Sequence, residues 1–570
     1  MISYVSLDST NDDERCFALL ATNNHDPLNY SEAINTENRI EWKNAIKDEL
    51  KSIEENKVWT LVDRPTVTLD GKRANIIDSR WVFKRKVNSE GKTTFKARLV
   101  VRGFKDKKEY ELRETYAPVS RLSVIRSALA VVNKYDLEVV QLDVKTAFLN
   151  GILDGEIYME IPDGLEVSAS NRQNKVCKLE KALYGLKVSP KKWNERFSVE
   201  MEKVGLQRDI NEPCLFTYRL MGMLIILVLY VDDILLAGNN KSKMQEIIDH
   251  LNKVFNMKNL GEPRDYLGMK IVRDRSNKLM TLSQADYIEK VLERFNMSES
   301  KPQNTPMITR QVRSRISNDQ KLTQTKRVEV PFREVIGSLL YLANVTRPDI
   351  AYAVNYLSRK QSDPTEEDWI DAKRILRYLR GTSKLGLNFR GKTEDLEIFN
   401  DASFRDYFDS TSTSGMAVLL FGNTVMWRSH KQNIINSSTC HTEYFAMSEA
   451  CQEAISLDKA LRDMLGKTMY PVTLWCDNKS SRDCTQKEGS HKLKSFDDSV
   501  EEIKSKLEKR EKTGVKVPLS ETHGDYVKQC VSEGKIEVRW VSTKDNIADV
   551  FTKPLPFDAF NKFRDRLLNL

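Results

Sequence analysis

Two adjacent carboxylates, Asp232 and Asp233, lie between two apolar runs of the chain. The run 224–231 and the shorter run 234–237 have the composition of two buried strands, which would pair as a hairpin with the aspartates at its bend. Asp is common at turns because its side chain bonds to nearby backbone, so a plain turn would explain the pair. Carboxylates held at the mouth of a buried hairpin are also what a hard divalent metal ion requires. The choice depends on whether further carboxylates join the pair.

A third carboxylate, Asp143, lies at the end of another apolar stretch, 137–144, which is predicted to be a strand. A single Asp in such a position is more often a cap than a metal ligand. If the strands of Asp143 and Asp232 are neighbours, however, three carboxylates meet at one edge of a sheet. Such a site would suit two Mg²⁺ or Mn²⁺ ions roughly 3.5–4 Å apart, one activating a hydroxyl and the other neutralising a leaving pyrophosphate. The three aspartates therefore favour phosphoryl transfer.

The last third of the chain repeats this arrangement with four acids. Asp401 and Asp477 each end a predicted short strand. Glu443 lies near the start of a predicted helix, and Asp549 opens another. Capping or turn chemistry would explain each acid by itself. Four acids at the ends of four elements nevertheless fit a two-metal site that hydrolyses phosphodiesters.

A predicted hairpin over 80–104 interleaves basic and aromatic residues. Lys84, Lys96 and Arg98 are its candidates for contact with phosphate. This composition is typical of a clamp for nucleic acid or for a triphosphate. A basic hairpin that merely faces solvent would look the same, so the hairpin alone leaves both interpretations open.

Composition limits the class of protein. Hydrophobic residues make up 40% of the 570 residues and charged residues 30%, which suits folded domains rather than disorder. The net charge of +8 has the sign expected for a polyanion partner, although the excess is small. The polar residues 1–24 do not resemble a signal peptide, and no uncharged apolar run reaches about 18 residues, so we expect no membrane partner. The eight cysteines and six histidines show no zinc-binding spacing and favour a reducing, intracellular setting.

Periodicity supplies the elements that would position these residues. Helical patterns cover 40–53, 122–135, 242–255 and, as several helices, 331–381. Residues 300–330 are rich in Ser, Thr, Gln, Asn and Arg and are predicted to be a linker. Residues 490–525 are highly charged but keep one apolar helical face.

The order of short motifs closely resembles the copia-type (Pseudoviridae-like) Pol polyprotein of LTR retrotransposons. The resemblance extends from residue 28 to residue 570. Its motifs are KARLV at 96–100, QLDVKTAFLNG at 141–151, LYGLK at 183–187, YVDD at 230–233, YLG at 266–268, TRPD at 346–349, RYLRGT at 377–382, SST at 437–439, EY at 443–444, CDN at 476–478 and IADVFTKPL at 547–555.

The resemblance implies an α+β chain. Its parts would be a right-hand polymerase with fingers, palm and thumb, a helical connection, and an α/β ribonuclease H-like domain. The expected domains are a flexible tail or linker at 1–38, the reverse transcriptase at 39–305, a linker and helical connection at 306–395, the ribonuclease H-like domain at 396–556 and a C-terminal tail at 557–570.

The resemblance also implies a role for each candidate residue. Asp143, Asp232 and Asp233 match the ligands of the catalytic metals. Phe148 matches the steric gate that excludes a ribose 2′-hydroxyl, although core packing would also explain an aromatic residue there. The residues expected to contact the incoming nucleotide are Lys84, Lys96, Arg98, Tyr184 and Gly185. The acids that match the catalytic, metal-binding set of ribonuclease H are Asp401, Glu443, Asp477 and Asp549.

Some positions depart from the family pattern. Val188 stands where the family usually has Gln, just after the motif at 183–187. The departures near the ribonuclease H acids are Ser403, Phe404, Cys440, His441 and Thr442. The departures therefore concern the ribonuclease H part more than the polymerase part.

The resemblance favours RNA- and DNA-directed synthesis of DNA, with cleavage of RNA in RNA–DNA hybrids. The expected partners are an RNA template, a DNA primer, the hybrid, dNTPs, and the integrase and capsid parts of the same element, in cytoplasmic virus-like particles and in the nucleus. The alternative is a catalytically inactive descendant that binds nucleic acid. A plain Mg²⁺-dependent nuclease is a weaker interpretation, because it leaves the first carboxylate group without a role. The sequence shows no protease loop, zinc knuckle or integrase zinc site, as expected of the C-terminal part of a Pol polyprotein.

Overall fold

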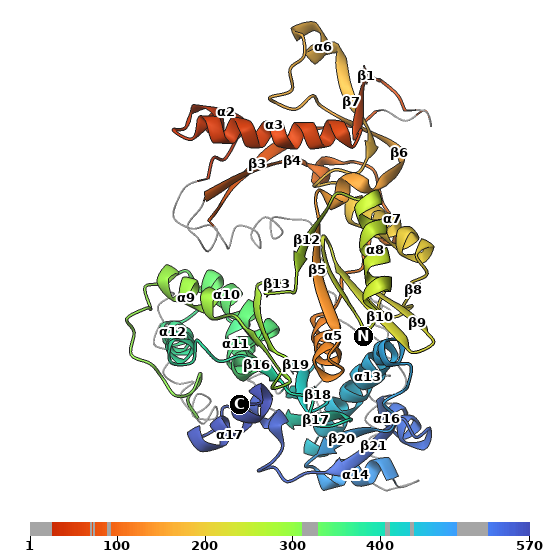
Figure 1. Cartoon of the computed structure of the whole chain (residues 1–570). Helices are drawn as coiled ribbons and strands as arrows, with labels where there is room; N and C mark the ends of the chain where they lie inside the picture. Colours follow the sequence, from red (N-terminus) through yellow and green to blue (C-terminus); the bar gives the residue numbers. More distant parts are fainter. Residues whose placement is uncertain are drawn as a thin grey trace, which may run out of the picture. The chain divides into compact units, whose positions relative to one another are not determined.

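Figure 1 shows the computed structural model of the chain. It describes residues 26–68, 71, 74–87, 93–309, 329–404, 411–433, 438–486 and 523–570. The described residues form two compact units, and the chain enters each unit more than once. The first unit draws on Met1–Ser120, Val140–Leu236 and Asn240–Gly261, and the second on Arg121–Val139, Ala237–Asn239 and Glu262–Leu570. Every helix among the described residues is too short or too polar to span a lipid bilayer.

A six-stranded sheet carries the first aspartates. Its strands, in spatial order, are β12 (Met257–Gly261), β5 (Glu138–Val144), β11 (Asp233–Gly238), β10 (Met223–Tyr230), β9 (Leu215–Leu220) and β8 (Gln207–Arg208). The apolar side chains of β10 and β11 pack in one core with the helices α7 (Ser189–Lys203) and α8 (Lys241–Val254). Trp193 and Phe197 of α7 and Leu251 of α8 are among its buried members. The hairpin predicted around Asp232 and the helix predicted over 242–255 are therefore confirmed.

A second part of the first unit surrounds the basic hairpin, formed by β3 (Ser79–Val87) and β4 (Thr93–Val101). Helix α3 (Arg39–Glu55) packs on this hairpin, with Trp42 edge-on to Phe83 and Phe95 at 5.2 and 4.8 Å between ring centroids. A four-stranded sheet follows the order β1 (Trp59–Asp63), β7 (Lys175–Lys181), β6 (Ile152–Met159) and β2 (Ile76–Ile77). The shorter elements are α2 (Tyr30–Asn35), η1 (Gly103–Lys105), α4 (Leu112–Thr115), η2 (Ala147–Asn150) and α6 (Ala169–Asn174).

The second unit begins with α5 (Leu122–Lys134), whose residues from Ser123 to Asn133 are all buried. A four-stranded sheet follows the order β13 (Asp265–Tyr266), β14 (Met269–Asp274), β15 (Leu279–Ser283) and β16 (Leu387–Phe389). The helices beside it in the chain are α9 (Ala285–Arg294), α10 (Phe332–Val345), η4 (Pro348–Ile350), α11 (Ala351–Ser358) and α12 (Glu366–Gly381). The helices predicted over 331–381 are thus confirmed.

A five-stranded mixed sheet carries the second group of acids. Its order is β19 (Asn423–Lys431), β18 (Thr413–Leu420), β17 (Leu396–Ser403), β20 (Val472–Cys476) and β21 (Ile536–Trp540). The first three strands are antiparallel, whereas β17, β20 and β21 run parallel. The remaining elements are α13 (Thr439–Leu465), α14 (Lys479–Gln486), α16 (His523–Ser532), η5 (Ile547–Phe551) and α17 (Phe557–Leu568).

The structure adds order where tails were expected. Residues 557–570, predicted to be a tail, contain helix α17, which buries Phe560 and Phe563. The described part of 1–38 contains α2. Much of the predicted linker (310–328) and of the charged stretch (487–522) lies outside the described residues.

Candidate active sites

The turn between β10 and β11 presents Asp232 and Asp233. Val231, which precedes them, has a φ of 57°, in the left-handed region that a β-branched residue rarely adopts. The indole Nε1 of Trp193 donates to the carbonyl oxygen of Val231 at 2.6 Å and so holds this conformation. The aspartates are therefore presented by a constrained turn, as rigid ligands would need.

Asp143 lies on β5, next to β11 in the sheet. The backbone N–H of Val144 donates to the carbonyl oxygen of Asp232 at 2.9 Å. The two strands are therefore neighbours, which is the condition under which the three carboxylates would meet at one sheet edge. The three aspartates are half-buried, which suits carboxylates that must reach a ligand at the edge of a sheet. Among the described residues, two groups of side chains have ligand atoms that all lie within 4.8 Å of one another. Asp143, Asp232 and Asp233 belong to neither group.

Tyr184 joins the predicted nucleotide residues to these aspartates. The Arg98 guanidinium lies over its ring at 4.8 Å, and the Phe148 ring meets it edge-on at 5.1 Å. Burial raises the pKa of Tyr184 to about 12, with Arg98 opposing the rise and the charges of Asp232 and Asp143 adding to it. Three of the predicted substrate residues therefore lie together, within electrostatic reach of the predicted metal ligands.

Gly185 has a structural reason for its identity. Its φ is +91°, and a Cβ there would lie 2.0 Å from the carbonyl oxygen of Val101. A Cβ on Gly103 would lie 2.2 Å from the carbonyl oxygen of Gly185, so the two glycines allow the backbones to touch. This contact fixes Tyr184, whose carbonyl oxygen accepts from the N–H of Val101 at 2.7 Å.

One face of the hairpin β3–β4 carries the three predicted cations. Lys84 lies directly opposite Lys96, and Arg98 lies opposite Val82 on the same face. The other face is buried and includes Trp81. The three cations thus lie on the face of the hairpin opposite the buried one. Val188, the nearby departure from the family pattern, is buried in the same apolar core as this hairpin.

The second group of acids comes together at one end of the mixed sheet. Asp401 lies on β17, Asp477 directly follows β20, Glu443 is in the first turns of α13, and Asp549 is in η5. The ligand atoms of Asp401, Asp477 and Asp549 all lie within 4.8 Å of one another. Those of Glu443, Cys476 and Asp477 form a second such group, so Asp477 links all four predicted acids.

The electrostatics of this cluster fit a hard cation. Burial and then the charge of Asp401 raise the pKa of Asp549 to about 8, and the same causes raise the pKa values of Glu443 and Asp477. Oε2 of Glu443 is buried without a hydrogen-bond partner. A divalent ion would offset this repulsion, and carboxylate oxygens are the ligands that Mg²⁺ prefers. The donor set therefore fits a divalent metal ion.

Lys553 is a member of this cluster that the sequence did not single out. Its Nζ lies 3.0 Å from Oδ1 of Asp549 and 3.7 Å from Oδ2 of Asp401. The hydroxyl of Thr552 also donates to Oδ2 of Asp401. The signal was the position of Lys553, four residues after Asp549 and inside the motif at 547–555.

Comparisons with known proteins show the family of the chain. Residues 56–309 match the family described as reverse transcriptase (RNA-dependent DNA polymerase). A transposon Ty5-1 protein of Saccharomyces cerevisiae is 34% identical over 319 residues, which are 55% of this chain and 100% of that protein. The chain belongs to the copia-type retrotransposon Pol family. Residues 56–309 are its reverse transcriptase domain.

Longer relatives match most of the chain. The retrovirus-related Pol polyprotein from transposon TNT 1-94 of Nicotiana tabacum is 35% identical over 95% of this chain and 39% of its own length. That from transposon RE1 of Arabidopsis thaliana is 32% identical over 92% of this chain and 34% of its own length. This Pol chain thus spans between a third and two-fifths of the length of these relatives. The structure titled foamy viral protease-reverse transcriptase in complex with ds DNA aligns with 88% of this chain and 70% of that one, at 11% identity and a TM-score of 0.42.

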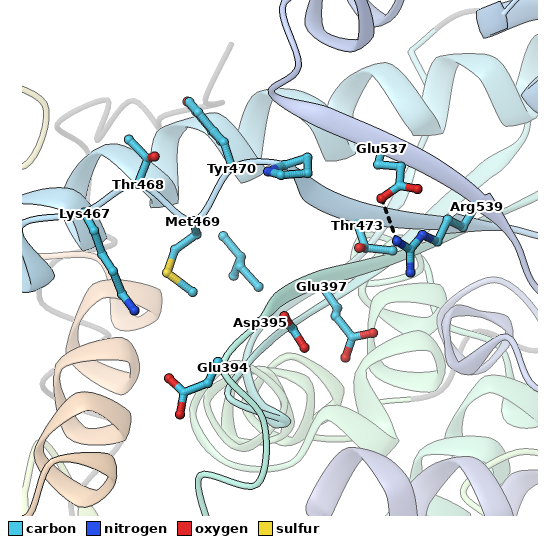
Figure 2. Close-up of a pocket in the computed structure, with 12 residues that line it drawn as sticks. Glu394, Asp395, Glu397, Lys467, Thr468, Met469, Tyr470, Thr473, Glu537 and Arg539 are labelled. Carbon is cyan, nitrogen blue, oxygen red and sulfur yellow. Dashed lines mark hydrogen bonds and ion pairs between the residues drawn. The ribbon is translucent and has the colours of Figure 1, made fainter.

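A pocket of this Pol chain lies away from the acids. Its volume is about 380 Å³, and Glu394, Glu397 and Lys467 are among the residues that line it (Figure 2). Glu537 and Arg539 form an ion pair on its wall at 2.7 Å. The pocket lies at the start of β17, whereas the acid cluster lies toward its end. The acids therefore have a setting of their own at the opposite end of the strand.

Proposed function

We propose that this chain is an RNA- and DNA-directed DNA polymerase that binds Mg²⁺ or Mn²⁺ at Asp143, Asp232 and Asp233. The observation that carries the proposal is the adjacency of β5 and β11, which brings the three aspartates to one region of one sheet in a chain of the Pol family. The carboxylates supply the all-oxygen donors that such an ion prefers. The presentation of Asp232 and Asp233 by a constrained turn supports this role.

The residues around the aspartates would bind and orient the nucleotide. A bound metal pair would polarise the attacking hydroxyl of the primer and neutralise the leaving pyrophosphate. Lys84, Lys96 and Arg98 would neutralise the triphosphate from one face of the hairpin. Phe148, fixed against Tyr184, would occupy the space that a ribose 2′-hydroxyl needs. Gly185 contributes by letting the backbone under Tyr184 approach β4.

The second cluster supports a ribonuclease H activity. Asp401, Glu443, Asp477 and Asp549 would hold Mg²⁺ or Mn²⁺, which supplies an activated water and charge neutralisation at the scissile phosphate. Burial of Asp401 and Asp549 keeps their oxygens at fixed positions. The departures at Ser403, Phe404 and Cys440–Thr442 flank these acids without replacing any of them. The cluster gives the ribonuclease H-like part its own chemistry.

The proposed substrates and parts follow from these two sites. The proposed substrates are an RNA template, a DNA primer, dNTPs and the RNA–DNA hybrid. The proposed parts are the polymerase at 39–305, the connection at 306–395 and the ribonuclease H-like domain at 396–556. The proposed partners are the integrase and capsid parts of the same element, in cytoplasmic particles and in the nucleus.

Substitution of Asp232 by Asn tests the polymerase. Asp232→Asn removes a charged ligand at nearly constant shape, so extension of a DNA primer on an RNA template should fall at least about a thousandfold. The matched control is Asp249→Asn, because Asp249 is exposed on α8 and should leave extension unchanged. Wild-type extension by Asp232→Asn would overturn the assignment. Absence of Mg²⁺-dependent extension in the unmodified chain would favour the inactive, nucleic-acid-binding descendant.

Substitution of Asp401 by Asn tests the second site separately. Asp401→Asn should abolish cleavage of RNA in a hybrid while primer extension stays within about twofold, because the two carboxylate groups lie in different compact units. Both activities are measured on the same preparation. Loss of both activities in a folded Asp401→Asn variant would argue against two separate sites.

A further inference from the structure

The ammonium of Lys553 lies among carboxylates that are proposed to bind metal. Its Nζ is 3.0 Å from Oδ1 of Asp549 and 3.7 Å from Oδ2 of Asp401. The side chains of the two acids are only 5% and 4% exposed, whereas that of Lys553 is 40% exposed. The lysine therefore reaches from a solvent-accessible position to two buried carboxyl groups.

The backbone that carries Lys553 is fixed, and its side chain has a path to solvent. The N–H of Lys553 donates to the carbonyl oxygen of Asp549 at 3.3 Å, and the Nδ2 of Asn546 donates to the carbonyl oxygen of Asn400 at 2.9 Å. Phe551 is fully buried beside it. Because the Lys553 side chain is partly exposed whereas Phe551 and Thr552 are buried, its four-carbon stem can move the ammonium without moving η5.

A metal ion and this ammonium compete for the same space. An ion held by Asp401 and Asp549 would lie about 2.0–2.1 Å from their oxygens. The ammonium already lies within 3.7 Å of both carboxylates, so the two cations would be in close contact. Their repulsion in a partly buried site is strong. This repulsion opposes simultaneous occupation of the cluster by the ion and the ammonium.

We propose that Lys553 is an internal competitor for the divalent cation at the second carboxylate cluster. Its ammonium neutralises Asp401 and Asp549 in the metal-free chain and leaves toward solvent when the ion enters. Lys553 is thus a positioning residue that sets the cation concentration at which the second cluster fills. This inference rests on the proposed ribonuclease H function only for its effect on RNA cleavage, not for cation binding.

Direct titration with Mn²⁺ tests the proposal. The host is the full chain with Asp232→Asn and Asp233→Asn, so that ions at the first group of aspartates do not contribute. Free Mn²⁺ is measured by its electron paramagnetic resonance signal. Lys553→Met, which keeps most of the stem and removes the charge, should lower the Kd for Mn²⁺ on the order of tenfold. Lys553→Arg keeps the charge, so its Kd for Mn²⁺ should stay within about twofold of that of the host.

Two controls locate the effect. Lys562→Met removes an exposed lysine of α17 that pairs with Asp545, and it should leave the Kd unchanged. Asp401→Asn should weaken the Mn²⁺ binding that Lys553→Met strengthens. An unchanged or increased Kd in Lys553→Met would overturn the proposal. That result is expected of a lysine that merely supports the fold or helps to hold the ion, because removal of such a lysine does not strengthen Mn²⁺ binding. If Lys553→Met does not fold, Lys553→Gln replaces it under the same criterion.

Cleavage of RNA separates this proposal from the proposed function. In the chain with intact first aspartates, Lys553→Met should lower the Mg²⁺ concentration for half-maximal cleavage by the same factor as the Kd. A lowered Kd in a chain that never cleaves RNA would support the competitor and overturn the ribonuclease H function. Cleavage of RNA by the unmodified chain, together with an unchanged Kd in Lys553→Met, would support the ribonuclease H function and overturn the competitor.

Discussion

The residue before Asp232 and Asp233 has a strained backbone conformation. Val231 is β-branched, yet its φ is 57°, a conformation that such residues avoid because of contact between Cβ and the backbone. Strain of this kind costs on the order of 1–3 kcal/mol and persists only where the surroundings impose it. The Trp193 bond to the Val231 carbonyl and the pairing of β5 with β11 are those surroundings. The turn thus trades stability for fixed carboxylates.

A buried carboxylate on α3 makes the first unit sensitive to pH. Glu49 is 8% exposed, and burial raises its pKa from 4.5 to about 7. The hydrogen bond that the carboxylate accepts from the Leu99 N–H and the charge of the nearby Arg98 oppose this rise. The folded chain therefore binds a proton that the unfolded chain has lost between those pH values. Stability must fall as pH rises through this window, because the folded state there holds the extra proton.

Glu49→Gln should remove this pH dependence. The amide keeps an oxygen for the Leu99 N–H but carries no charge, so the variant should gain up to about 3 kcal/mol over the unmodified chain at pH 8 and little at pH 4.5. Urea unfolding at both pH values, followed by tryptophan fluorescence, measures the difference. Glu54→Gln, at an exposed site on the same helix, is the control. A Glu49→Gln variant that is less stable at pH 8 would show that the carboxylate is needed as an anion.

Sequence reasoning found the acids at this scale but not their partners. Asp143, Asp232 and Asp401 could be predicted because each lies at the end of an apolar run, and strand ends meet at sheet edges. Lys553 was not singled out, because a lysine after a turn is usually solvated and only the fold shows that its position after Asp549 brings it to Asp401. The pKa of Glu49 depends on burial under a hairpin that begins 30 residues later in the chain, at Ser79.

At the scale of elements, a buried ion pair joins two of the family motifs. Arg347 and Asp349 are fully buried and bond through two nitrogen–oxygen pairs at 2.9 and 2.7 Å. Tyr378 of α12 donates its hydroxyl to Asp349 at 2.6 Å, and Arg347 also donates to Thr382. The motifs at 346–349 and 377–382 therefore meet in one network that fixes η4 against α12.

Asp349→Asn should destabilise the second unit severely. It leaves the Arg347 guanidinium buried without its counter-ion, which typically costs about 3–5 kcal/mol. Chemical unfolding of the variant measures this loss. Asp286→Asn removes an exposed carboxylate 4.0 Å from Lys270 and should change stability by less than about 1 kcal/mol. A loss in Asp349→Asn as small as that in Asp286→Asn would show that water or a neighbour replaces the lost charge.

Element predictions succeeded where one apolar face repeats over several turns. The pattern at 40–53 became α3, because Trp42, Ile46 and Ile53 pack under the basic hairpin. Helix α17 was missed, although Phe560, Phe563 and Leu567 recur at helical spacing and are buried. The short segment at the end of the chain was expected to be a tail. Its burial depends on a sheet formed elsewhere in the sequence, which local pattern cannot show.

At the scale of the whole molecule, α5 connects the reverse transcriptase region to the later chain. Arg126 is buried, and burial lowers its pKa to about 9. Its guanidinium donates to the carbonyl oxygens of Asn344, Val345 and Val425 and stacks on Trp427 at 4.0 Å. Two of these carbonyls end α10, where a cation also offsets the negative end of the helix dipole. Helix α5 lies within 56–309 but completes its packing with residues beyond 309.

A fragment that ends at residue 309 should therefore fold poorly. The fragment keeps α5 but loses the residues that bond to or stack on Arg126. Residues of α5 that are buried in the full chain would therefore be exposed to water in the fragment. We expect the fragment to bind a hydrophobic dye and to elute as aggregates in size-exclusion chromatography, whereas the whole chain elutes as a discrete species.

Arg126→Met in the whole chain provides a graded comparison, because it leaves three buried carbonyl oxygens without their donor. The loss should be about 1–3 kcal/mol of unfolding free energy for each oxygen that water cannot reach. Arg113→Met, at an exposed site, should cost little. A monomeric fragment with the unfolding temperature and primer extension of the whole chain would show that the reverse transcriptase region folds without the later packing, and that Arg126 is a local feature of α5.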